Sequence, residues 1–138
     1  MIILDTNVIS ELMRPAPHRR VSAWVGARAA GRIYTTALNK AEVLLGVELL
    51  PKGRRRDALH EAADAMFAEL FATRVLPFDA AAAQQYGRIV SSRIRSGRPI
   101  EAIDAQICAI CLLHGATIAT RNVSDFTDCD VEVLDPWA

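Results

Sequence analysis

Acidic and amide side chains follow the apolar run at the start of the chain. Residues 2–4 (IIL) lead directly into Asp5, and Thr6 and Asn7 come next. Such residues are frequent helix N-caps, because their oxygens accept hydrogen bonds from the free N–H groups of the first turn. In open α/β sheets, however, the carboxyl ends of strands are also where ligands bind. The segment therefore fits either a helix cap or a functional site.

Two further carboxylates lie within apolar stretches that have helical spacing. Glu42 shares a predicted helix face with Leu38, Leu45 and Leu49, and Asp104 lies among isoleucines and cysteines. A carboxylate in an apolar stripe is costly unless another group pairs with it. Either arginines pair with these two acids, or they share an acidic pocket with other side chains.

Polar residues also follow the apolar run at 117–120. Asn122 and Asp125 come shortly after it, in the same relation to a predicted strand as Asp5. They form either an Asx-turn or a fourth polar position of the pocket. Together, clustered carboxylates without His or Cys suit a hard cation, Mg²⁺ or Mn²⁺. Such an ion polarises phosphoryl oxygens and lowers the pKa of bound water, so the pattern predicts metal-dependent phosphoryl chemistry.

The charge of the chain is zero overall but unevenly placed. Its 16 basic residues balance 16 acidic residues, and almost all of the bases are arginine, whose planar fork matches phosphate oxygens. Basic residues dominate 14–56 and acids dominate 122–138. This distribution fits either ordinary solvated faces or a basic rim that attracts a nucleic-acid backbone around an acidic centre.

The elements that must position these residues alternate along the chain. We expect short strands at 2–5, 33–35, 74–77, 117–120 and 131–134, and helices after the first strand and at 21–30, 38–50, 54–73, 79–95 and 101–113. Strands that alternate with helices indicate βαβ units. We therefore predict an α/β fold with a mostly parallel central sheet of four to five short strands flanked by helices, in a single domain over 1–138.

Several motifs, in this order and spacing, resemble the PIN-domain ribonucleases of the VapC toxin type, which belong to bacterial toxin–antitoxin pairs. They are ILDTNVISEL at the start, AEVLLGV, LPFD, IEAIDAQICA, ATIATRNVSDF and the closing DPW. The resemblance covers nearly the whole chain. It implies a PIN fold and Mg²⁺-dependent hydrolysis of RNA, with Mn²⁺ as a substitute. It further implies a cognate antitoxin that lays its C-terminal segment along a groove, and a homodimer.

The resemblance also implies roles for particular residues. Asp5 and Asp104 would be direct metal ligands, and Glu42 would complete the acidic pocket. Many relatives have aspartate at the position of Asn122, so the present chain departs from that pattern. Asn122 would then orient water or bond to Asp5, and Asp125 would supply the fourth charge. The catalytic set expected from the resemblance is Asp5, Glu42, Asp104, Asn122 and Asp125.

Two other functions remain open at the level of sequence. A phosphatase of the haloacid-dehalogenase type also has Asp at the end of its first strand, but it needs a second Asp two residues on, where this chain has Asn7. A PIN-like module that binds metal and an antitoxin peptide without catalysis is the second alternative, and Asn122 is the residue that favours it.

The remaining features predict ordinary roles. Cys108 and Cys111 lie in mid-helix among apolar residues and are expected to be small core residues, because reactive CxxC pairs usually lie at a helix start. Three cysteines do not form a disulfide framework. No apolar run is long enough to span a membrane, and Asp5 and Glu11 interrupt the start where a signal peptide would be apolar. We therefore expect a cytoplasmic protein.

Overall fold

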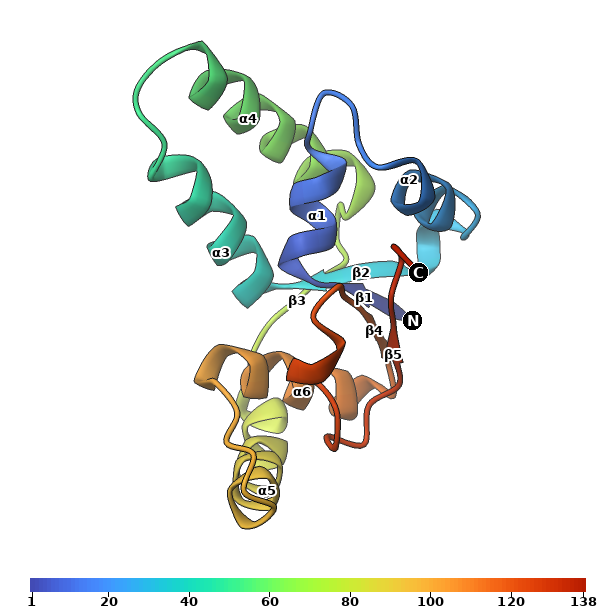
Figure 1. The fold of residues 1–138 in the computed structure, drawn as a ribbon, viewed down its shortest axis with the longest axis vertical. Coiled ribbons are helices and arrows are strands. Elements are labelled where there is room, and N and C mark those ends of the chain that lie inside the picture. The colour runs from blue at the N-terminus through green and yellow to red at the C-terminus, as the bar shows by residue number, and fades with distance from the viewer.

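A computed structural model of the protein, which describes residues 1–138, has one parallel sheet of five strands at its centre (Figure 1). The strands are β1 (Ile2–Leu4), β2 (Ile33–Thr36), β3 (Val75–Leu76), β4 (Thr117–Ala119) and β5 (Val133–Leu134). Their spatial order is β3-β2-β1-β4-β5, and every pair is parallel. The predicted α/β class and parallel sheet are confirmed.

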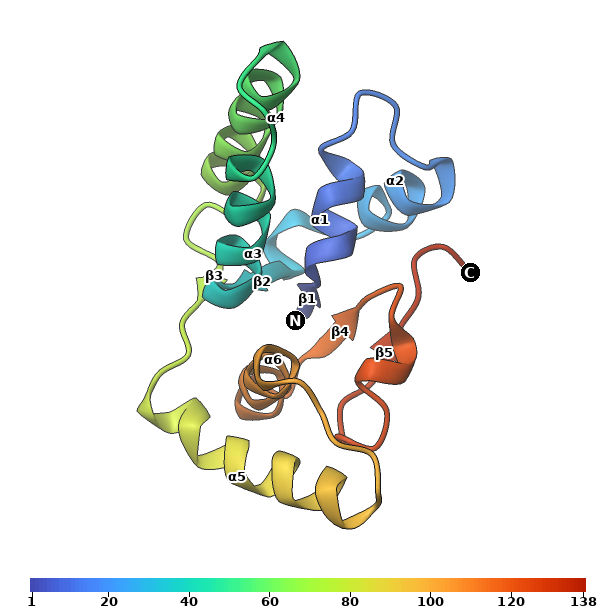
Figure 2. The same ribbon diagram turned by 60° about the vertical axis from the view of Figure 1, so that its left-hand side comes forward.

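Helices cover both faces of this sheet. They are α1 (Thr6–Leu12), α2 (Arg19–Gly26), α3 (Ala37–Glu48), α4 (Arg54–Ala65), α5 (Ala80–Arg95) and α6 (Ala102–His114). Figures 1 and 2 show α1 to α4 on one side of the sheet, with α3 and α4 as a projecting hairpin, and α5 and α6 on the other side. Parallel sheets require such cover, because the crossover helices bury both faces.

The central strand β1 contributes to two separate hydrophobic cores. Ile2 and Leu4 pack in the core under α1 to α4, and Ile3 packs in the core under α5 and α6. This division follows from the alternation of side chains along a strand. Because β1 is buried on both faces, the end of this strand is held firmly by the sheet, and so is the residue that follows it.

Local sequence signals set the ends of most helices. The Asp79 carboxylate accepts from the N–H of Ala82 at the start of α5, and the Thr36 hydroxyl accepts from Asn39 N–H at the start of α3. Gly115 ends α6 with a φ of 60°, in the left-handed region that glycine adopts at low cost. These helices lie within a few residues of the predicted ranges.

Two predicted helices differ from the structure. The helix expected at 21–30 begins earlier, at Arg19, and ends at Gly26, where glycine weakens helix propagation. The helix expected at 54–73 ends as regular α-helix at Ala65 and continues as a wider π-turn over Met66–Leu70. Phe67 and Phe71, whose ring centroids are 5.6 Å apart, both lie in the core at this turn.

None of the helices combines the length and apolar character that a bilayer crossing requires.

Candidate active site

The polar residues singled out in the sequence gather at the carboxyl ends of β1 and β4. These two strands are direct neighbours in the sheet, and the strand order changes direction between them. In open α/β sheets the crevice at such a switch point is the usual ligand site. Asp5 follows β1 and Thr120 follows β4, so the backbone alone brings two distant parts of the chain together.

Asp5 is a buried carboxylate that accepts hydrogen bonds from three directions. Its donors are the N–H of Thr6 at 2.9 Å, Nδ2 of Asn39 at 2.9 Å and the hydroxyl of Thr120 at 2.7 Å. Asp5 is also the N-cap of α1, so one residue serves both as the helix cap and as part of the candidate site. Burial raises the pKa of this carboxyl, and the nearby Glu42 raises it further, while the three hydrogen bonds lower it.

Thr6 and Asn39 link Asp5 to Glu42. The Thr6 hydroxyl donates to Glu42 Oε1 at 2.7 Å and accepts from Asn39 Nδ2 at 3.1 Å. Asn39 is fully buried, and its Oδ1 accepts from the Thr36 hydroxyl at 2.6 Å. Asn39 was missed by the sequence analysis, although its place one turn before Glu42 on the same predicted helix face was a signal for it.

Thr120 and Asn7 connect the first loop to the loop after β4. The Thr120 hydroxyl, which donates to Asp5, accepts from Asn7 Nδ2 at 3.2 Å and from the N–H of Asn122 at 3.1 Å. Asn7 Oδ1 accepts from the N–H of Arg121 at 3.2 Å. Asn7 therefore links the first loop to the loop after β4, and Thr120 is a second polar residue of the site that the sequence analysis did not select.

Asp104 lies at the start of α6 within the field of the other acids. Burial, and after it the charges of Asp125, Asp5 and Glu42, together raise the pKa of its carboxyl to about 6. The side chain makes no hydrogen bond or ion pair with another residue. Asp104 is thus a half-buried carboxylate whose negatively charged neighbours disfavour its ionised form.

The alternative that arginines pair with these acids is wrong. The ion pairs of the molecule involve Glu11, Glu48, Asp64 and Asp128, but none of the acids at the site. The apolar stripe expected around Glu42 is also wrong in part. Leu45 is 57% exposed and Leu49 is 75% exposed, so this face of α3 is open and Glu42 is only half-buried.

Asn122 and Asp125 lie at the exposed edge of the site. A 3-10 turn (Val123–Asp125) begins after Asn122, and the N–H of Asp125 donates to the backbone oxygen of Asn122. No side-chain oxygen of Asn122 accepts a backbone N–H, so the alternative of an Asx-turn at Asn122 is wrong. The Asn122 side chain makes no hydrogen bond to the protein, so the bond to Asp5 that the resemblance implied for it is absent. Asp125 acts on the site through its charge, which among the neighbouring charges is the largest cause of the raised Asp104 pKa.

The chemistry of this donor set fits a divalent cation that keeps part of its water shell. No three Asp, Glu, His or Cys side chains lie close enough to ligate a single ion together. Mg²⁺, however, is usually held by one or two carboxylates with water and substrate phosphate as the other ligands. Asp5 and Asp104 are two such carboxylates, and a cation beside them would offset the burial and the charges of neighbouring carboxylates that raise their pKa values.

The cysteines have the structural role expected for them. Cys108 and Cys111 are fully buried, unpaired and part of the core under α5 and α6. Burial raises the pKa of the Cys111 thiol to about 12. Neither residue belongs to the acidic site, and the interpretation as small core residues is confirmed.

Known proteins resemble this chain over nearly its full length. The family model of the PIN domain matches residues 2–130. The chain is 43% identical over 137 residues to Toxin FitB of Neisseria gonorrhoeae, covering 99% of each chain, and 36% identical to VapC ribonuclease Y4jK of Sinorhizobium fredii, covering 99% of this chain and 98% of the other. A solved structure of FitAB bound to an IR36 DNA fragment matches with a TM-score of 0.93 and 43% identity, covering 100% of this chain and 96% of that one.

The fold is that of a PIN domain, and the chain belongs to the PIN-domain family. The resemblance to toxins of the VapC type, which the sequence motifs carried, is confirmed by these relatives.

Proposed function

We propose that this protein is a metal-dependent endoribonuclease toxin of a toxin–antitoxin pair, which hydrolyses RNA phosphodiester bonds and is neutralised by a cognate antitoxin. The observation that carries the proposal is a cluster of carboxylates, Asp5, Glu42, Asp104 and Asp125, without a basic partner at the switch point of the sheet. Two full-length relatives named as a toxin and as a VapC ribonuclease support the same activity.

In this proposal Asp5 and Asp104 hold Mg²⁺, with Mn²⁺ as a substitute. The bound ion would polarise a phosphate oxygen and lower the pKa of a water molecule. The hydrogen bonds from Thr6, Asn39 and Thr120 hold the Asp5 carboxylate in one orientation. The metal-facing geometry of Asp5 is therefore set before substrate arrives, which is the condition for efficient electrostatic catalysis.

Glu42 and the loop after β4 act around this centre. Glu42 accepts from the Thr6 hydroxyl, which leaves its second oxygen free to orient the attacking water. Asp125 supplies the fourth negative charge, since its field already reaches Asp104. Asn122, whose side-chain amide is free, donates a hydrogen bond to water or to a phosphate oxygen at the exposed edge.

The antitoxin would occupy a groove that opens beside Glu42. This groove has a volume of about 840 Å³ and lies between α1, α3 and α4. Val43, Val47 and Leu59 line it with apolar surface, and Arg14 and Arg55 stand at it as cations. A peptide with apolar anchors would fill the groove and block Glu42, which supports inhibition by occupation of the site. A homodimer of the toxin is part of the same proposal.

RNA cleavage by the purified protein tests the function directly. Freed of any partner, the protein is incubated with total RNA in Mg²⁺, in Mn²⁺ and in chelator. We expect cleavage in either metal, none in chelator, and loss of at least about 100-fold in rate for Asp104→Ala, since a direct ligand would be gone. The exposed Glu61→Gln variant is the matched control and should cleave as the wild type does.

Three results would overturn the assignment. Equal cleavage by Asp104→Ala would show that the activity comes from a contaminant or from another site. Binding of Mg²⁺ without cleavage of any RNA, together with capture of an antitoxin peptide, would favour the binding-only module. A covalent phosphoryl group trapped on Asp5 would favour a phosphatase of the haloacid-dehalogenase type.

A further inference from the structure

An arginine and a tryptophan lie next to the acidic cluster and have no part in the site described so far. Arg121 follows Thr120, whose hydroxyl binds Asp5, and the backbone N–H of Arg121 is held by Asn7 Oδ1. The Arg121 side chain is exposed, and its guanidinium carbon lies 5.1 Å from the centroid of the Trp137 ring. A cation is therefore presented at the edge of the candidate active site, over an aromatic face.

Trp137 is itself held in place. It packs against the core under α1 to α4, and its backbone N–H donates to Asp135 Oδ1 at 2.9 Å. The indole is thus a firm base for Arg121 rather than a mobile C-terminal side chain.

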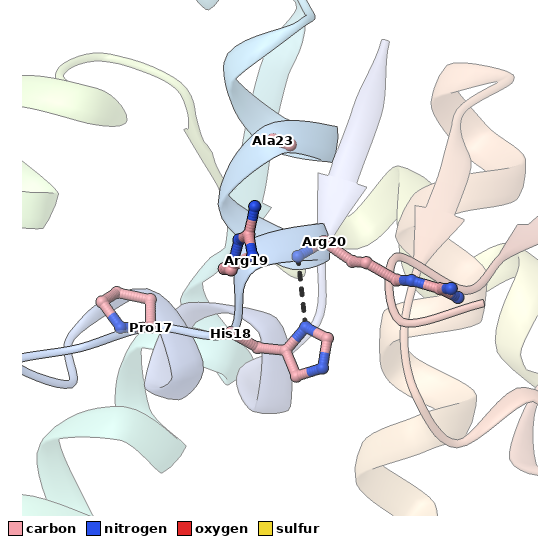
Figure 3. A pocket seen from close by; sticks show the side chains of 5 residues that line it. All are labelled: Pro17, His18, Arg19, Arg20 and Ala23. Atoms are coloured by element: carbon pink, nitrogen blue, oxygen red, sulfur yellow. Dashed lines mark hydrogen bonds between the residues drawn. The ribbon is translucent and has the colours of Figure 1, made fainter.

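A second arginine continues the basic surface beyond Trp137. Arg20 Nη1 lies 3.4 Å from the backbone oxygen of Trp137 and donates to it. Figure 3 shows Arg19 and Arg20 extending in different directions from the start of α2, beside a hollow of about 740 Å³ lined also by Pro17, His18 and Ala23.

The cations of this surface have no carboxylate partner. Arg19, Arg20 and Arg121 form no ion pair. Two acids that contact residues of this surface are engaged elsewhere: Glu11 pairs with Arg14 and accepts from the N–H of His18, and Asp135 accepts from the N–H of Trp137. Three uncompensated guanidinium groups are therefore available to an external anion.

We propose that Arg121, packed over the Trp137 ring, and Arg20 beyond it bind the single-stranded RNA that lies next to the scissile phosphate. We call the surface formed by these three residues the track. This inference rests on the proposed ribonuclease function. The order along the surface is acidic cluster, Arg121, Trp137, Arg20 and then the hollow. Guanidinium forks bind phosphate oxygens, and a guanidinium plane or an aromatic ring stacks on an unpaired base. Charge alone would suit an acidic peptide equally, but the stacked guanidinium beside a phosphate-cleaving centre favours RNA.

Arg121 is in this view a positioning residue. It would fix the nucleotide next to the reacting phosphate, so that the phosphate reaches the acidic centre in one orientation. Substrates long enough to reach Arg20 would bind more tightly than those that end at Arg121. Loss of Arg121 would weaken RNA binding even when no metal is present and no cleavage takes place.

Tryptophan fluorescence tests the proposal without catalysis. The protein has two tryptophans, so Trp24→Phe leaves Trp137 as the only reporter, and Asp104→Asn with chelator prevents cleavage. Titration with single-stranded oligouridine should change the Trp137 emission. Arg121→Ala should weaken binding about tenfold and lower the salt dependence by about one phosphate contact. Arg121→Lys should restore the salt dependence but not the full affinity, because lysine does not stack as arginine does.

Arg95→Ala is the matched control, since it removes an equal charge from an exposed site on α5, on the other side of the sheet. Equal affinity of Arg121→Ala and Arg95→Ala would overturn the track while leaving the ribonuclease proposal intact. Metal-dependent cleavage that is lost in Asp104→Ala, together with unchanged RNA binding and weakened antitoxin binding in Arg121→Ala, would assign the surface to a protein partner instead. Absence of RNA binding and of cleavage in the wild type would overturn both proposals.

Discussion

Asp104 is the residue of the acidic cluster whose charge should respond most clearly to pH. Its carboxyl pKa is raised to about 6 from an ordinary value of 3.8. The folded protein therefore binds a proton at this group over a pH range in which the unfolded chain has already released it. The contribution of Asp104 to stability is most favourable below about pH 4 and decreases as the pH rises toward about 6.

We predict that the melting temperature of the metal-free protein falls between about pH 4 and pH 6, and that Asp104→Asn removes part of this fall. At pH 7 the variant should be more stable than the wild type by about 1 kcal/mol, after allowance for solvent screening of a half-buried group. Thermal melts at a series of pH values check this. The exposed Glu61→Gln should follow the wild-type curve, and an identical curve for Asp104→Asn would contradict the prediction.

Asn39 is the residue that connects Asp5, the proposed metal ligand, to Thr6 and Thr36. Its amide donates to Asp5 and Thr6, and its oxygen accepts from Thr36. We predict that Asn39→Ala lowers the free energy of unfolding by about 2 kcal/mol, because a buried hydroxyl and a buried carboxylate lose partners. It should also reduce RNA cleavage, because Asp5 loses a bond that orients it.

Denaturant unfolding and a cleavage assay measure the two effects of this substitution. The exposed Gln84→Ala on α5 is the control and should change stability by less than about 0.5 kcal/mol. Wild-type stability and activity in Asn39→Ala would show that the hydrogen bonds around Asp5 have no positioning role.

At the scale of elements, one buried arginine joins α5 to the loop between β4 and β5. Arg93 is 5% exposed and donates to the backbone oxygens of Arg98, Asp125 and Thr127. Its guanidinium also lies 3.5 Å from Cys129 Sγ. The sequence left open whether the arginines form solvated faces or a basic rim, but Arg93 does neither and instead holds the loop that carries Asn122 and Asp125.

We predict that Arg93→Met destabilises the protein by about 3 kcal/mol, because buried carbonyl groups lose a charged donor. Amide hydrogen exchange in residues 122–130 should accelerate more than exchange in β1 or α3, since the loop loses its anchor while the sheet does not. Arg95→Met, an exposed neighbour on the same helix, should change neither quantity. Uniform acceleration over the whole chain would indicate global destabilisation and contradict a local anchoring role.

At the scale of the whole molecule, the sheet separates two cores, and α3 of the first half also contacts α6 of the second. The core under α1 to α4 includes Leu4 and Val8, and the core under α5 and α6 includes Ile3 and Ile107. Asp5, at the start of α1, belongs to the first half and Asp104 to the second, so a cation held by both would tie the two halves together. Ligands that bind only the folded state stabilise it by mass action.

We therefore predict that Mg²⁺ raises the melting temperature of the wild type by several degrees, which corresponds to about 2.7 kcal/mol at 100 times the dissociation constant. Asp5→Asn should abolish the shift, since a direct ligand becomes neutral. Differential scanning fluorimetry with increasing Mg²⁺ measures this effect, and Glu61→Gln should keep the full shift. A shift that survives in Asp5→Asn would place the cation elsewhere.

Much of the fold follows from local patterns in the sequence. The apolar runs at 2–4 and 117–119 predict buried strands, and their alternation with amphipathic helices predicts a parallel sheet. The same patterns overestimated the helix at 54–73, since periodicity does not distinguish an α-helical turn from the π-turn at Met66–Leu70. The helical spacing also predicted an apolar stripe with Leu45 and Leu49, but both leucines are exposed, because spacing identifies a helix face and not what covers it.

By itself the sequence determined the class of fold and the carboxylates Asp5, Glu42 and Asp104, since strand ends and apolar faces are local features in which an acid is conspicuous. Only the tertiary structure decided that Asn39 and Thr120 orient Asp5, that no arginine neutralises the cluster, and that Arg121 rests on Trp137. These are contacts between residues far apart in the chain. Hydrogen bonding and charge pairing depend on distances in space, which the order of strands β3-β2-β1-β4-β5 sets and sequence spacing does not.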